Sequence, residues 1–212
     1  VVLPYLRSRG ITALQDLVIS HGDLDHAAGL DSVRVALPVL RLWMGGEDAL
    51  PQAARPCRAG QAWSWAGGPR FRFLSPAAAQ GLSGNDASCV LMVDTGRGRV
   101  LLAGDISQPQ EFQLLRYWRQ ALAADVLLVG HHGSATSTAQ AWLNHVDPTL
   151  AIHSAGYGNR FGHPHPRVQA RLAAHGVRQH MTWQQGALEV AFPDTAFPQP
   201  AVDAARAKTW WK

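Results

Sequence analysis

The sequence has little cysteine, almost no lysine and no long apolar run. Its two cysteines, Cys57 and Cys89, are too few for a disulfide framework, and Cys89 lies in an apolar pattern that predicts a small core residue. No stretch is long and apolar enough to cross a membrane and no signal peptide opens the chain, so this fragment is expected to be soluble. Internal repeats are also absent, which excludes solenoid architectures.

The basic residues are nearly all arginine, because the only lysines are Lys208 and Lys212. Arginine suits bidentate contact with phosphate, so the net charge of +4 favours a polyanionic partner. A high-GC genome that favours Arg and Ala codons explains the same composition equally well. The 212 residues can bury one large core, and Val1 opens the sequence without a Met, so a longer parent protein is expected.

Residues 20–26, which read Ser-His-Gly-Asp-Leu-Asp-His, carry the densest cluster of potential metal ligands. They follow a short apolar strand and precede good helix formers, which places them on a strand-to-helix turn. Alternation along an extended segment puts His21, Asp23 and Asp25 on one side, and His26 joins them as the chain turns. Imidazole and carboxylate ligands together suit Zn, Mn or Fe. A solvated polar loop is the alternative interpretation.

Alternating strands and helices predict an α/β architecture. Helices are expected over residues 1–9, about 26–37, 108–122, 137–146 and 167–174. Strands are expected over residues 17–19, 39–44, 71–74, 89–93, 100–103, 126–129, 150–152, about 179–182 and 187–192, with 89–93 and 100–103 forming a hairpin. Trp63, Trp65, Phe71 and Phe73 indicate either core packing, the commoner case, or base stacking. Residues 1–193 are expected to form one hydrolase domain, and residues 194–212 a poorly ordered tail.

The 21–26 segment resembles the His-x-His-x-Asp-His motif of the metallo-β-lactamase superfamily, with Asp23 in place of the second His. An Asp there is similar to the C-terminal domain of the ComEC competence family, the channel proteins of bacterial DNA uptake. Residues 85–88 (Asn-Asp-Ala-Ser), 130–134 (Gly-His-His-Gly-Ser) and 159–165 (Asn-Arg-Phe-Gly-His-Pro-His) also resemble that family. The implied fold is a four-layer αββα sandwich with its metals at one sheet edge. The family's further strand pair, ahead of the position of Val1, is missing from this sequence.

The resemblance also implies the site residues. Asp105 would by itself be read as a helix cap, but it takes the place of the superfamily's bridging Asp. Adjacent residues at a strand end point in opposite directions, so His132 is expected to bind metal and His131 to face the substrate or lie behind the ligands. The expected metal ligands are His21, Asp23, Asp25, His26, Asp105 and His132. The expected catalytic residues are Asp25, His131 and His163, and the expected substrate contacts are Asn85, Ser88, Ser134, Asn159 and His165.

Three carboxylates harden this ligand set, so two divalent ions are expected, Mn²⁺ first, with Zn²⁺ or Mg²⁺ as alternatives. Such a pair suits phosphodiester hydrolysis. The resemblance implies a DNase domain that degrades the strand that does not enter the cell. Its partners would be single-stranded DNA and the channel and other domains of the same membrane protein, at the periplasmic face of the inner membrane, with no stable small-molecule cofactor. The alternatives are a small-molecule phosphodiesterase or lactonase, and a degenerate DNA-binding module that lacks the third-motif His.

Overall fold

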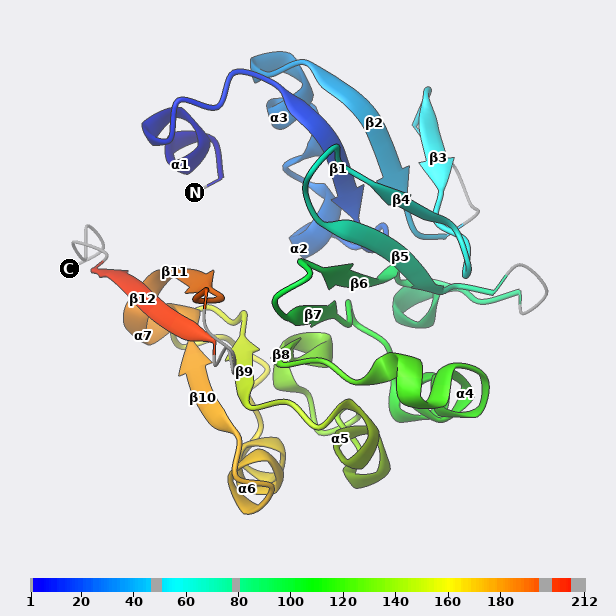
Figure 1. Cartoon of the computed structure of the whole chain (residues 1–212), viewed down its shortest axis with the longest axis vertical. Helices are drawn as coiled ribbons and strands as arrows, with labels where there is room; N and C mark the ends of the chain where they lie inside the picture. The colour runs from blue at the N-terminus through cyan, green and yellow to red at the C-terminus, as the bar shows by residue number, and fades with distance from the viewer. Residues whose placement is uncertain (1, 47–50, 78–80, 195–199, 207–212) are drawn as a thin grey trace.

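The computed structural model describes residues 2–46, 51–77, 81–194 and 200–206, which form three sheets (Figure 1). The small sheet is parallel, in the order β1 (Leu14–Ile19), β2 (Val39–Met44) and β3 (Ala54–Pro56). The large sheet has the order β10 (Arg178–Met181), β9 (Leu150–His153), β8 (Val126–Leu128), β7 (Arg99–Leu102), β6 (Val90–Asp94), β5 (Arg70–Ser75) and β4 (Ala62–Ser64). A two-stranded antiparallel ribbon pairs β11 (Gly186–Ala191) with β12 (Ala201–Arg206).

The large sheet is mixed. Strands β7 to β10 run parallel, as expected for strands joined by helical crossovers, whereas β4 to β7 run antiparallel and include the predicted β6–β7 hairpin. The α-helices are α1 (Val2–Ser8), α2 (Leu24–Ala27), α3 (Leu30–Ala36), α4 (Gln108–Trp118), α5 (Gln140–Val146), α6 (Pro166–Ala174) and α7 (Thr182–Gln185). Short 3-10 segments are η1 (Gly84–Ala87), η2 (Arg119–Leu122) and η3 (Gly130–Gly133). Among the described residues, no helix is both long and apolar enough to span a bilayer.

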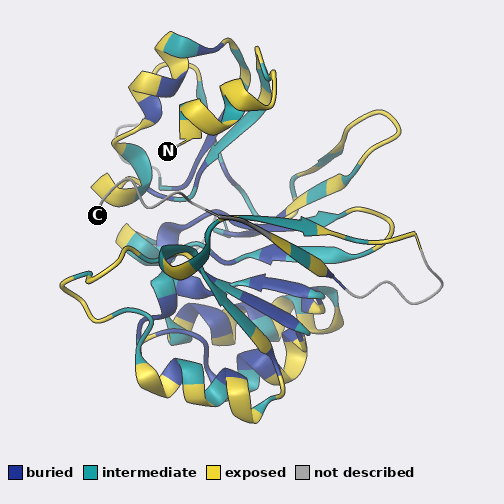
Figure 2. Cartoon of the chain, turned by 90° about the vertical axis from the view of Figure 1, so that its left-hand side faces the viewer, coloured by how far each residue is buried: buried dark blue, intermediate teal, exposed yellow. Residues whose placement is uncertain are grey.

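Three apolar clusters separate four layers, which confirms the αββα sandwich. Leu30 of α3 packs with Leu42 of the small sheet, and Phe73 packs with Trp43 between the two sheets. On the far face of the large sheet, Leu101 belongs to one cluster with residues of α4, α5 and α6. Figure 1 shows α3 and the small sheet above and α4, α5 and α6 below, and Figure 2 shows the buried residues concentrated between them. Because side chains alternate along a strand, β5 and β6 supply both of the inner clusters.

The aromatic residues between the sheets act as core. Trp63 stacks on Trp43 and on Phe71, each with ring centroids 5.1 Å apart. The indole nitrogens of Trp43, Trp63 and Trp65 all donate to the carboxylate of Asp16. Rings held in this way are committed to the sandwich, so the structure favours core packing over base stacking.

Two sequence predictions are wrong in detail. The helix expected over about residues 26–37 is divided into α2 and α3 by a turn at Ala28 and Gly29. The tail expected to be poorly ordered supplies β12, which pairs with β11 across six residue pairs. This pairing joins segments on either side of residue 193, whereas the proposed boundary at that residue stays a prediction. A strand of small, alternating residues such as 201–206 has a weak local signal and depends on its neighbour.

Cys57 and Cys89 form a disulfide, which corrects the expectation drawn from cysteine number. Cys89 is buried in the inter-sheet cluster, so its prediction as a core residue is confirmed. The bridge joins the chain just after β3 to the residue before β6. The backbone N–H of Cys89 also donates to the carbonyl of Ser20, so the bridge adjoins the ligand turn.

Candidate metal centre

The ligand turn follows β1, and its side chains gather around the ring of His26. The Nε2 atom of His26 lies 3.3 Å from Oδ2 of Asp105, 3.1 Å from Nε2 of His132 and 3.7 Å from Oδ2 of Asp25. Two three-residue groups have ligand atoms within 4.8 Å of one another, and they share His26. One group is His21, His26 and Asp105, and the other is Asp25, His26 and His132.

His21 lies beneath this cluster and is almost fully buried, with 1 % of its surface exposed. Its Nε2 atom has no hydrogen-bond partner in the described part of the chain and lies 3.5 Å from Oδ2 of Asp23. Burial, and then the neighbouring His26, lower the pKa of His21. A buried, neutral imidazole with an unpaired nitrogen is disfavoured unless a ligand satisfies it, so this atom fits a bound metal.

Asp105 is held in place by Ser88 and by a glycine. Gly104 has φ of +59°, and a Cβ there would lie 2.7 Å from Cβ of Ser88, so the sharp turn after β7 requires glycine. The hydroxyl of Ser88 accepts the N–H of Asp105. Burial alone would raise the pKa of Asp105, but the hydrogen bond from His26 and the charges of the nearby histidines lower it. The carboxylate is therefore ionised and can act as a metal ligand.

The pKa of His26 moves upward for the complementary reason. Burial would lower it, but the hydrogen bond and charge of Asp105 outweigh burial. The Nδ1 atom of His26 lies 2.9 Å from the hydroxyl of Ser20, which is also 3.1 Å from Nδ1 of His21. Ser20 thus orients both rings with their Nε2 atoms toward the carboxylates.

The paired histidines occupy a turn with both residues in the left-handed region, at φ of 50° for His131 and 55° for His132. Such strain in consecutive non-glycine residues is typical of functional sites. The carbonyl of Ser154 lies 2.7 Å from Nδ1 of His132, a contact that places the proton on Nδ1 and leaves the Nε2 lone pair facing Asp25 and Asp105.

His131 points elsewhere. Its Nε2 atom lies 3.3 Å from Nδ2 of Asn85, and its ring lies 5.9 Å from that of His163 in an edge-on arrangement. Neither candidate metal group includes it. Burial lowers the pKa of His163, whose Nδ1 atom has no hydrogen-bond partner in the described residues.

A cleft of about 510 Å³ opens above the cluster. Its lining combines the acidic turn, the paired histidines and the loop before α6: Asp23, Leu24, Asp25, Asn85, Asp105, His131, His132, Arg160, Phe161 and His163. Arg160 lies over the ring of Phe161 at 4.7 Å, and Phe161 stacks on His163. Sequence reasoning missed Leu24, Arg160 and Phe161 as cleft residues, although each adjoins a motif residue.

Four of the expected substrate contacts lie outside that cleft. Ser88 is fully buried and also donates to the carbonyl of Asn85. Ser134 pairs with the hydroxyl of Thr136, and Asn159 uses both ends of its amide within its own loop. His165 caps α6 by accepting the N–H of Arg167. Only Asn85, of the five expected contacts, lines the cleft.

Comparisons with known proteins agree with this geometry. Residues 2–152 match the model of the metallo-beta-lactamase superfamily. The chain is 37 % identical over 188 residues to competence protein ComA of Neisseria gonorrhoeae, covering 89 % of this chain and 27 % of the relative. It is 38 % identical over 192 residues to recombination protein 2 of Haemophilus influenzae, covering 90 % of this chain and 24 % of the relative. The chain thus spans about a quarter of the length of these relatives.

Solved structures show the same fold. The metallo-beta-lactamase fold protein YhfI of Bacillus subtilis aligns with a TM-score of 0.52 at 12 % identity, covering 85 % of this chain and 78 % of that one. A CmlA beta-hydroxylase variant aligns with a TM-score of 0.53 at 13 % identity, covering 80 % of this chain and 43 % of the other. The expected resemblance to competence proteins is confirmed, and the chain belongs to the metallo-β-lactamase superfamily, whose members are mostly metal-dependent hydrolases.

Proposed function

We propose that this domain is a metal-dependent phosphodiesterase that cuts DNA during uptake and degrades the strand that does not enter the cell. The observation that carries the proposal is the cluster of imidazoles and carboxylates around His26, with its unpaired His21 nitrogen, beneath an open cleft. Relatives named for competence and recombination support DNA as the substrate class.

The ligand set fits two divalent ions. One would be held by His21, Asp23, His26 and Asp105, and the other by Asp25, His132 and the shared groups. Carboxylates make up half of the six ligands, which favours Mn²⁺ or Mg²⁺ over Zn²⁺. When bound, such ions supply Lewis-acid activation of a phosphodiester and a nucleophile at neutral pH. Two divalent ions would exceed the charge of three carboxylates by one, which favours an anionic phosphodiester.

The walls of the cleft suit a nucleotide chain. Arg160 is the only arginine or lysine among the cleft residues, and its stacking on Phe161 holds the guanidinium at the mouth, where it can pair with a phosphate. Leu24 and Phe161 are 82 % and 64 % exposed and both line the cleft. Exposed apolar side chains beside a charged centre can contact the sugars and bases of a strand.

His131 and His163 are the candidate proton donors. Both rings line the cleft without joining either metal group, so they remain free to exchange protons with a leaving oxygen. Asp25 is exposed at the same wall and would both bind metal and orient the attacking water.

The disulfide supports a location in an oxidising compartment, such as the periplasmic face of the inner membrane. We propose that the domain serves there beside the channel of its longer parent protein. Thiol alkylation of the protein in intact cells, followed by mass spectrometry, should leave Cys57 and Cys89 unmodified until a reductant is added. Free thiols at both positions would contradict this placement.

The decisive experiment incubates the purified protein with single-stranded DNA in Mn²⁺, Mg²⁺ or Zn²⁺, with parallel measurement of bound metal. We expect cleavage with Mn²⁺, two ions per chain, and loss of cleavage in Asp105→Asn but not in Asp31→Asn, which changes an exposed carboxylate on α3. DNA binding with fewer than two ions and no cleavage would instead indicate a degenerate binding module. That alternative has one specific support, because no His occurs between His26 and His131.

A further inference from the structure

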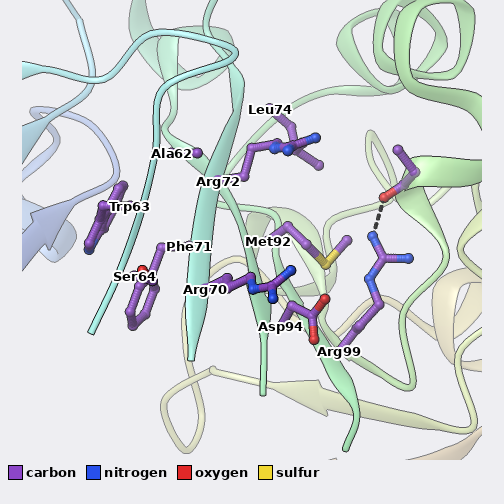
Figure 3. Close-up of a pocket in the computed structure, with 11 residues that line it drawn as sticks. Ala62, Trp63, Ser64, Arg70, Phe71, Arg72, Leu74, Met92, Asp94 and Arg99 are labelled. Atoms are coloured by element: carbon purple, nitrogen blue, oxygen red, sulfur yellow. Dashed lines mark hydrogen bonds between the residues drawn. The ribbon is translucent and has the colours of Figure 1, made fainter. Parts of the chain in front are cut away.

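A second cavity, of about 460 Å³, lies on the helix-covered face of the large sheet, at the end of β7 opposite to the metal centre (Figure 3). Its lining is notable for three arginines beside one carboxylate. The lining residues are Ala62, Trp63, Ser64, Arg70, Phe71, Arg72, Leu74, Met92, Asp94, Arg99 and Ala121. We call the part formed by Arg70, Arg72, Asp94 and Arg99 the arginine groove.

Strand alternation places these arginines on the same face. Phe71 and Phe73 turn into the inter-sheet core, whereas Arg70 and Arg72 turn the other way, as Figure 3 shows for Phe71, Arg70 and Arg72. Asp94 pairs across the strands with Arg70 on one side and with Arg99 on the other. The groove is therefore built by the register of β5, β6 and β7.

The positive charge in the groove is largely uncompensated. Arg70 and Arg72 are exposed and take part in no hydrogen bond or ion pair with any residue that the structure describes. Arg99 donates to the carbonyl of Ala121, a neutral partner that leaves its charge intact. Asp94 accepts the N–H of Gly96. Three guanidinium groups thus face one carboxylate, a local excess of two positive charges.

The floor strengthens this charge. Leu74 and Met92 are 2 % and 4 % exposed, so the guanidinium groups stand over a surface of low polarity. Low-dielectric walls focus the field of charges in a concavity and raise the local concentration of counter-ions. Guanidinium also pairs with phosphate in a planar, bidentate geometry.

We propose that the arginine groove binds the phosphate backbone of a DNA strand, remote from the metal centre. This inference rests on the proposed function, because it names as the anion the polymer that the metal centre would cut. An elongated groove with two arginines at alternate strand positions, roughly 6.6 Å apart, fits a chain of phosphates. A flat anionic bilayer could reach a recessed floor less easily.

The distance to the metal centre predicts a length dependence. Arg99 begins β7 and Asp105 follows its end, a separation of roughly 15–20 Å for a chain of this length. A single strand at about 3.4 Å per nucleotide needs on the order of five nucleotides to span it. Longer oligonucleotides should therefore bind more tightly, and shorter ones should lose the contribution of the groove.

The test compares a double variant, Arg70→Gln with Arg72→Gln, with a control that removes the same charge elsewhere, Arg34→Gln with Arg167→Gln, both exposed residues on helices. Binding of a single-stranded oligonucleotide of about 20 nucleotides is measured in chelator at several salt concentrations. We expect the slope of log affinity against log salt to fall by roughly 1.4 in the groove variant, about 0.7 for each lost phosphate contact. The control should keep the slope and affinity of the unmodified protein.

A second measurement separates this proposal from the first. Hydrolysis of a minimal phosphodiester that is too short to reach the groove should be equal in the groove variant and the unmodified protein. If neither protein hydrolyses it while the slopes still differ, the nuclease proposal fails and the groove stands. Equal slopes in all three proteins, equal losses in groove variant and control, or binding to phosphatidylglycerol vesicles in place of DNA would each overturn the groove.

Discussion

Glu111 offers a stringent test of the physical reasoning, because its titration should govern part of the pH dependence of stability. It lies in α4 with 1 % of its surface exposed, and its carboxylate accepts the backbone N–H groups of Thr138 and Ala139. Arg171 binds the carbonyl of Thr138 from the other side. These bonds hold the loop after the paired histidines against α4.

Burial raises the pKa of Glu111 from 4.5 to about 7, although the two N–H donors and Arg171 oppose the shift. Between these values the unfolded chain has released the proton while the folded protein retains it. The folded protein therefore binds more protons, and stability from this group is complete below pH 4.5 and is lost as the pH rises through about 7. At about 1.4 kcal/mol for each pKa unit, the loss is about 3 kcal/mol.

Urea denaturation of the protein and of Glu111→Gln, below pH 4.5 and above pH 7, measures this contribution. Glutamine does not titrate, so the free energy of unfolding of the unmodified protein minus that of the variant should fall by about 3 kcal/mol between the two conditions. Glu189→Gln, at a half-exposed carboxylate, is the matched control and should show a much smaller change. A pH-independent difference for Glu111→Gln would refute the argument, since other titrating groups cancel in the comparison.

Three further predictions concern the sandwich and the ligands. Asp16→Ala should lower the free energy of unfolding by about 3 kcal/mol because buried donors lose their acceptor, while the exposed Asp31→Ala should change it little in the same urea titration. Asp23→His should bind Zn²⁺ more tightly and lose Mn²⁺-dependent activity, and unchanged affinities in titration calorimetry would exclude Asp23 as a ligand. His132→Ala should lower metal content and abolish hydrolysis, whereas His131→Ala should keep both metals and slow about 10–100-fold, and the reverse pattern in metal analysis would exchange their roles.

Elements with a strong local pattern could be predicted from the sequence. Residues 39–44 were expected as a strand and form β2 with the same bounds, and the hairpin of β6 and β7 follows from two apolar runs around a glycine turn. The disulfide and β12 could not be predicted in this way. Both depend on a partner far along the chain, and neither the number of cysteines nor a short run of small residues identifies that partner.

The candidate site divides along the same line. The ligand turn is contiguous, so its residues could be recognised together. The functions of Asn159 and His165 depend on how their loop folds, and the loop uses both side chains for its own hydrogen bonds. Arg160 and Phe161 reach the cleft because that same fold turns them outward toward the metal cluster. Residue type alone does not reveal such a division of labour within one loop.

The origin of the ligands links metal binding to the stability of the sandwich. His26 comes from the turn after β1 in the small sheet, whereas Asp105 and His132 follow β7 and β8 in the large sheet. The 3.1 Å approach of His26 to His132 therefore exists only while the two sheets are held together. The Asp16 hydrogen bonds and the disulfide both cross this interface, and the disulfide adjoins the ligand turn. Because metal binds the assembled sandwich and not the separated sheets, changes that loosen this interface must weaken metal affinity even where they touch no ligand.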